Sequence, residues 1–69
     1  MATVTQKFGQ RVKDLRKKKG LTQEQLAEKA KIDHSYLNAI EAGKKNPSLK
    51  RIAKLARVLE VSLPEFFSF

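Results

Sequence analysis

Residues 21–45, with the sequence LTQEQLAEKAKIDHSYLNAIEAGKK, decide the fold of this chain. Thr22 is a favourable helix N-cap, and Gln25 three residues later completes a capping box. Apolar side chains then recur at helical spacing until β-branched Ile32 interrupts the pattern. This arrangement predicts a helix over residues 23–30.

A second helix is predicted within a few residues of the first. Asp33 is a strong N-cap, and Leu37 and Ile40 continue an inward-facing stripe until Gly43 ends it. The predicted helix covers residues 34–42. Because the turn between the two helices is about three residues long, the pair has the spacing of a helix-turn-helix unit.

The same signals predict helices on both sides of this pair. Phe8, Val12 and Leu15 share one face of a first helix that ends at Gly20. A later helix begins after its N-cap, Ser48, and its apolar stripe starts with Leu49 and Ile52. The solvent side of this helix carries four basic residues, Lys50, Arg51, Lys54 and Arg57. Ser62 and Glu65 form another capping box. These three helices are predicted at 5–19, 49–59 and 63–67. The predicted fold class is therefore all-α, with five helices in a single domain over residues 1–69.

Composition excludes several functional classes. A domain of 69 residues is too small for a deep catalytic pocket, and the absence of cysteine removes disulfides and thiolate metal sites. No metal ion or cofactor is expected. Asp33, His34 and Ser35 share the residue types of a hydrolase triad, but sequential neighbours cannot converge on one substrate atom, so an enzyme is not expected. No apolar run is long enough for a membrane span, and a cytoplasmic location is expected.

Positive charge flanks the central helix pair. The net charge is +8, from 15 Lys and Arg against 7 Asp and Glu. Residues 7–19 and residues 44–57 each carry a net charge of +6, whereas residues 20–43 and 58–69 each carry −2. If the fold brings the two basic segments together, they form a surface suited to a polyanion such as nucleic acid. The alternative is a solvated surface that only keeps the protein soluble.

The segment GLTQEQLAEKAKIDHSYLNAIEAGKKNPS, followed by LKRIAKLARVLEVSLPEFF, resembles the phage repressor and Cro family of helix-turn-helix proteins, which includes restriction–modification controller proteins. The resemblance covers about residues 5–67. It rests on the LTQEQLA motif, on the Glu-Ala-Gly that ends the recognition helix, and on the Asn-Pro-Ser before the fourth helix. The resemblance implies a lambda-repressor-like domain of bacterial or phage origin, and a homodimer that reads operator DNA with residues 34–42 in the major groove.

Position by position, the resemblance assigns base readout to the exposed N-terminal part of this helix. Asn38 can bond adenine, Ala39 can contact a thymine methyl group, and His34 can donate to a guanine acceptor. Ser35 can pair with several bases. For His34 alone, without the family context, an idle surface histidine is the stronger reading. The predicted base-reading residues are His34, Ser35, Asn38 and Ala39.

The same comparison assigns contacts with the DNA backbone to the two ends of the helix pair. Gln23 matches a glutamine that binds a phosphate and braces the recognition helix, and a helix N-terminus itself suits an anion. The loop lysines are expected to position the protein more than to choose a sequence. The alternative is that Lys44 and Lys45 are simply solvated and do not contact DNA. The predicted backbone residues are Thr22, Gln23, Tyr36, Lys44, Lys45 and Asn46.

Two positions test this interpretation inside the domain. Glu41 places a negative charge in the last turn of the recognition helix, where the helix dipole disfavours it. The resemblance pairs Glu41 with Arg16 of the first helix. Lys31 departs from the family, which usually has glycine at this turn because the backbone there is left-handed. A lysine in that conformation costs roughly 1 kcal/mol, so the sequence leaves two alternatives, a strained turn or a turn of different shape.

The C-terminal segment contains three of the four phenylalanines. A helix of one to two turns cannot bury all three within its own domain, and exposed apolar area often marks an interface. A homodimer contact is predicted here, the alternative being that two rings close the core and one covers a surface gap. The predicted interface residues are Val58, Leu63, Phe66, Phe67 and Phe69.

These observations favour a sequence-specific regulator of transcription that binds an inverted repeat of double-stranded DNA as a homodimer. Its control would come from its own concentration, from operator overlap or from contact with RNA polymerase. A second hypothesis is an antitoxin or protein-interaction adaptor that uses the same fold to bind a partner protein. RNA binding is weaker, since no aromatic stacking platform is present.

Overall fold

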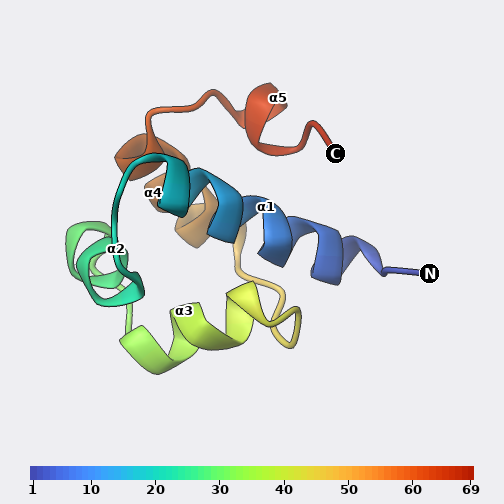
Figure 1. The fold of residues 1–69 in the computed structure, drawn as a ribbon, viewed down its shortest axis with the longest axis horizontal. Helices are drawn as coiled ribbons and strands as arrows, with labels where there is room; N and C mark the ends of the chain where they lie inside the picture. The colour runs from blue at the N-terminus through green and yellow to red at the C-terminus, as the bar shows by residue number, and fades with distance from the viewer.

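Five helices and no strand make up the computed structural model, which describes all residues 1–69 (Figure 1). Their bounds are α1 Val4–Lys18, α2 Gln23–Ala30, α3 His34–Glu41, α4 Leu49–Leu59 and α5 Leu63–Phe66. The predicted all-α fold with five helices is confirmed. No helix has the length and apolarity needed to cross a bilayer.

Local capping explains where the helices begin. The predicted capping box of Thr22 and Gln25 is present at α2, and Ser62 forms the equivalent box at α5. A third box, not predicted from the sequence, joins Thr3 and Gln6. Because Thr3 is the N-cap, α1 begins one residue earlier than predicted.

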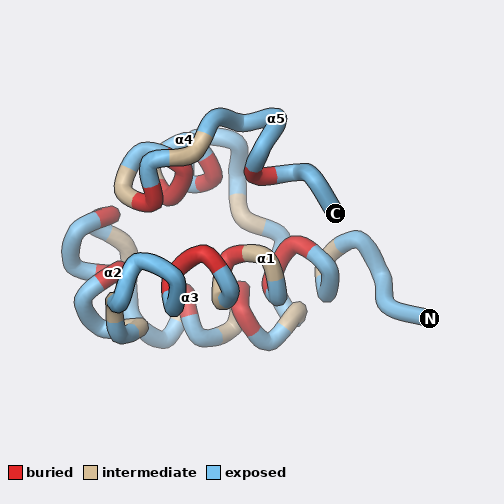
Figure 2. Tube along the Cα trace, turned by 45° about the horizontal axis from the view of Figure 1, so that its top comes forward, coloured by how far each residue is buried: buried red, intermediate tan, exposed pale blue.

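Helix α1 packs mainly against α3, and α2 packs against both α3 and α4. In Figure 1, α1 crosses the molecule with α3 below it and α5 above it. The buried positions of each helix face the space that the helices enclose (Figure 2). The largest fully buried side chains are Phe66, Leu26, Leu37, Ile40, Leu55 and Val12.

Two predictions about apolar residues are wrong. Leu49 does not join the core stripe of α4, because it is the first helical residue and lies ahead of the core contacts that begin at Ile52; its side chain is 81% exposed. Phe66 is not a surface residue. It is completely buried, with its ring centroid 4.9 Å from that of Phe8, so it closes the core within the monomer.

The backbone is left-handed at two non-glycine residues. Lys31, the C-cap of α2, has φ 56° and ψ 46°, so the turn whose shape the sequence left open is left-handed although its residue is not glycine. Glu60, the C-cap of α4, has φ 58° and ψ 43°, which was not expected. Glu60 forms an ion pair with Lys19 at the end of α1. Helices α2 and α4 therefore both end with a left-handed residue, α2 at the turn before α3 and α4 at the turn before α5.

Replacing Lys31 with glycine should raise the free energy of unfolding by about 1 kcal/mol, because glycine adopts a left-handed backbone without the Cβ clash. Urea denaturation of both proteins measures the difference. Lys31→Ala is the control: it removes the same charge but keeps a Cβ atom, and it should not stabilise the protein. A loss of stability in Lys31→Gly would contradict the geometry of this turn.

Candidate nucleic-acid interface

The outward face of α3 carries the side chains predicted to read bases. Leu37 and Ile40, on its inward face, are completely buried and fix the helix against the core. On the other face three side chains are exposed and one is partly exposed. These four residues are His34, Ser35, Asn38 and, partly exposed, Ala39.

Asp33 caps α3 and orients Ser35. Its carboxylate accepts hydrogen bonds from the backbone N–H groups of Ser35 (3.1 Å) and Tyr36 (3.3 Å), and the Ser35 hydroxyl also donates to it. These hydrogen bonds hold the pKa of Asp33 below its usual value. The Ser35 hydroxyl has the largest effect, and the backbone N–H of Tyr36 has the next largest. Because the Ser35 hydroxyl donates to a carboxylate, its free capacity toward a nucleobase is that of an acceptor.

Gln23 connects the two ends of α3. Its Nε2 donates to Glu41 Oε1 at 3.0 Å, and its Oε1 lies 3.2 Å from Nε2 of His34. Residues 34 and 41 are the first and last of the helix. The bracing role expected for Gln23 is therefore visible. One N–H of its amide group remains free for another acceptor.

Arg16 and Glu41 form the predicted pair beneath the recognition helix. Arg16 Nε and Nη2 donate to the two carboxylate oxygens at 2.8 and 3.0 Å. Arg16 Nη1 donates to the carbonyl of Leu21 at 2.8 Å, so one guanidinium joins α1, the start of the α2–α3 unit and the end of α3. The side chains are only 10% and 3% exposed.

The loop after α3 holds the three predicted backbone residues Lys44, Lys45 and Asn46, all exposed. The backbone N–H of Lys44 donates to the carbonyl of Ala39 at 2.9 Å, which continues the end of α3 into the loop. The hydroxyl of Thr5 in α1 donates to Oδ1 of Asn46. Asn46 therefore anchors the loop, and the two lysines extend from a fixed backbone.

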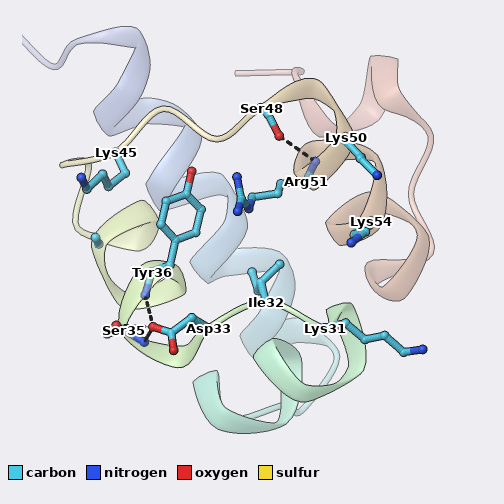
Figure 3. Close-up of a pocket in the computed structure, with 11 residues that line it drawn as sticks. Lys31, Ile32, Asp33, Ser35, Tyr36, Lys45, Ser48, Lys50, Arg51 and Lys54 are labelled. Atoms are coloured by element: carbon cyan, nitrogen blue, oxygen red, sulfur yellow. Dashed lines mark hydrogen bonds between the residues drawn. The ribbon is translucent and has the colours of Figure 1, made fainter.

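The structure adds residues that the sequence predicted only for a solvent face. Lys50, Arg51 and Lys54 of α4 line a groove with Tyr36 and Ser48, and Arg51 extends from α4 toward Tyr36 of α3 (Figure 3). The guanidinium carbon of Arg51 lies 4.7 Å from the centroid of the Tyr36 ring. The net charge of +6 over residues 44–57 was the available signal, but it did not indicate which helix these side chains face.

The structure divides the predicted interface residues of the C-terminal segment. Leu63, Phe67 and Phe69 are 48%, 43% and 49% exposed. Val58 is half-buried and lines a hollow with Lys29 of α2, whereas Phe69 lines a different hollow at the start of α1. Leu63, Phe67 and Phe69 therefore form an exposed C-terminal patch.

A short second helix, a tight left-handed turn and an exposed third helix braced from within define a helix-turn-helix domain. Residues 12–66 match the helix-turn-helix family model, and the chain belongs to this family. It is 47% identical over 55 residues to the immunity repressor protein of Bacillus phage phi105, an alignment covering 80% of this chain and 38% of the repressor. The resemblance inferred from the sequence is thus confirmed.

Two solved structures are similar over most of the chain. The restriction–modification controller protein C.AhdI from Aeromonas hydrophila has a TM-score of 0.85 and 44% identity, covering 91% of this chain and 94% of that one. The biofilm regulator SinR in complex with DNA has a TM-score of 0.84 and 42% identity, covering 88% and 98%. Several relatives are longer in full sequence than the chain. The chain spans 38% of the phage repressor, 51% of the full SinR sequence of Bacillus subtilis and 32% of the transcriptional regulator PuuR of Escherichia coli.

Proposed function

We propose that this protein regulates transcription by binding a specific sequence of double-stranded DNA with α3 in the major groove. The observation that carries the proposal is the position of α3: its reading face is free, while Gln23, Arg16 and Glu41 hold it from behind. Such fixation suits base recognition, since a side chain must meet a base edge within hydrogen-bond distance. The similar protein SinR forms a complex with DNA, which supports DNA as the ligand.

Each proposed reader has a definite chemical capacity. Asn38 offers an amide that can pair with adenine N6 and N7, and Ala39 offers a methyl group for contact with thymine. Ser35 acts as an acceptor, which favours the amino group of adenine or cytosine. His34 is oriented by Gln23, so its ring reaches a base only in a position that the brace allows. Thr22 and Gln23 at one end and Lys44 and Lys45 at the other are proposed to hold phosphates.

Selection of duplexes from a random pool with the purified protein tests this function. A recurring sequence, and binding that weakens with salt by a log–log slope near −0.9 for each phosphate engaged, are expected. An inverted repeat with half-sites about one helical turn apart would also support a dimer. Binding of all duplexes with equal affinity would contradict specific recognition.

Asn38→Ala and Lys45→Ala should affect DNA binding differently. Loss of the Asn38 amide should weaken the selected site by about 1–3 kcal/mol and relax the preference at one base pair. Loss of Lys45 should weaken all sequences alike and reduce the salt slope by about one. Fluorescence anisotropy on the selected duplex and on single-base variants separates the two effects. Equal loss on every sequence for Asn38→Ala would remove Asn38 from base readout.

We also propose that the C-terminal patch joins two copies of the chain. The ring of Phe67 lies at 5.5 Å from Phe8 and at 6.4 Å from Phe69, so the patch extends the aromatic core to the surface. A symmetric dimer would bury each exposed ring twice. The dimer would place two recognition helices on one operator, as an inverted repeat requires.

Phe69→Ala should weaken dimerisation at least about tenfold, because burial of a phenylalanine contributes about 1.5–3 kcal/mol. Sedimentation velocity at tens of micromolar measures the monomer–dimer equilibrium. Leu49→Ala is a matched control, since Leu49 is 81% exposed and outside the patch. A wild-type monomer that Phe69→Ala leaves unchanged would overturn the dimer and favour an adaptor whose exposed rings bind another protein.

A further inference from the structure

A basic groove lies between α3 and the first half of α4 (Figure 3). Its volume is about 640 Å³, and its lining includes five cationic side chains and one carboxylate. The carboxylate belongs to Asp33, which already accepts three hydrogen bonds as the cap of α3. Five cations against one carboxylate give the lining a net charge of +4, and Oδ2 of that carboxylate is already bonded to Ser35 and Tyr36.

None of the groove cations has an acidic partner within the protein. The two ion pairs of the molecule join Arg16 to Glu41 and Lys19 to Glu60, both outside the groove. Because the cations of this lining outnumber its single carboxylate and form no ion pair, they repel one another, and an anion among them relieves that repulsion. The charge distribution therefore favours an anionic ligand that contacts several of these side chains at once.

Arg51 is the groove cation that packs against an aromatic ring. Its guanidinium carbon is 4.7 Å from the Tyr36 ring centroid, and its side chain extends across the groove from α4 toward α3 (Figure 3). Its backbone N–H donates to Ser48 Oγ at 3.3 Å. Contact with an aromatic face restricts the guanidinium while leaving its five N–H donors available for phosphate oxygens.

The position of the groove identifies the kind of anion. Ser35 and Ala39, two proposed base readers, also line it, so the groove runs along the side of α3 that faces α4. A helix with a diameter of about 10–12 Å fills the major groove of DNA, whose width is about 12 Å. Side chains on either side of α3 would therefore lie against the two sugar–phosphate backbones that border the groove. Gln23 lies on the side of α3 that faces α2, and the basic groove of the protein lies on the side of α3 that faces α4.

We propose that the groove between α3 and α4 seats consecutive phosphates of one operator strand beside the bases read by α3. Lys50, Arg51 and Lys54 supply the charges, and Tyr36 holds Arg51 in place. This inference rests on the proposed function and extends the backbone contact from the loop onto α4. It makes α4 part of the DNA interface.

The test uses the triple variant Lys50→Ala/Arg51→Ala/Lys54→Ala and the selected duplex. Its matched control, Lys7→Ala/Lys17→Ala/Lys18→Ala, removes three exposed charges from α1. Because alanine favours helix, circular dichroism should show both variants folded. The groove variant should lose at least about tenfold in affinity and about 2–3 in salt slope, with the selected sequence unchanged. Equal losses in the two variants would overturn the proposal, because they would reflect net charge alone.

Neutral methylphosphonates placed one at a time along the duplex locate the phosphates. At the phosphates in the groove, this substitution should weaken the wild-type protein several-fold and leave the triple variant unaffected. The same penalty in both proteins at every position would also overturn the proposal. Failure of the wild-type protein to bind any duplex is a distinct result: it would refute the proposed function and this inference together.

Discussion

Gly9→Ala is expected to lower the free energy of unfolding by about 1–2 kcal/mol, although Gly9 lies in the middle of α1, where alanine is the better helix former. A Cβ atom at this position would lie 2.2 Å from the carbonyl oxygen of Ile40 and 3.0 Å from that of Glu41. Both are backbone atoms of α3, so no side-chain rotation relieves the clash. Overpacking of this kind typically costs about 1–3 kcal/mol and sometimes more, which outweighs the gain of about 1 kcal/mol in helix propensity.

Urea denaturation measures this effect. Lys17→Ala, at an exposed position of the same helix, is the control and should leave the midpoint almost unchanged. The clash involves the C-terminal turn of α3, so any Gly9→Ala protein that folds should also bind the selected duplex less tightly. Wild-type stability and binding in Gly9→Ala would mean that α1 and α3 separate without penalty.

Gly9 also illustrates what a single sequence can reveal about this fold. The helix limits were predictable within one residue because the caps involve groups only two to five positions apart, as at Thr22 and Gln25. The requirement for glycine at position 9 arises from α3, more than thirty positions later. No local pattern contains that information, and within α1 alone this glycine is merely a poor helix former.

The candidate site also combines features that the sequence predicts with features that only the structure reveals. The caps at Asp33 and Ser48 followed from sequence, and the pairing of Arg16 with Glu41 followed from the family resemblance. The direction of Lys50, Arg51 and Lys54 did not, because helical periodicity identifies the side chains that avoid the core but not the neighbour they approach. Leu49 was misplaced for a related reason: periodicity does not indicate where along a helix the core contact begins.

Removal of one partner from the Arg16–Glu41 pair should have the largest effect on stability. Arg16→Ala should lower the free energy of unfolding by about 3–5 kcal/mol, because a buried carboxylate then keeps only the Gln23 amide as a partner. Glu41→Leu should be similarly damaging, since the guanidinium of Arg16 would remain buried with only the Leu21 carbonyl to accept from it.

The double variant Arg16→Met/Glu41→Leu separates the strength of the pair from the penalty of leaving a charge unpaired. Replacement of both charges by apolar groups of similar volume leaves no buried ion, so the double variant should be markedly more stable than either single variant. Urea unfolding of all four proteins gives the coupling energy. If the two single losses simply added, Arg16 and Glu41 would act independently, and the pair would not be what holds α3 against α1. If the double variant is stable but binds the selected duplex weakly, the pair serves mainly to orient the recognition helix, since Gln23 loses its Glu41 partner at the same time.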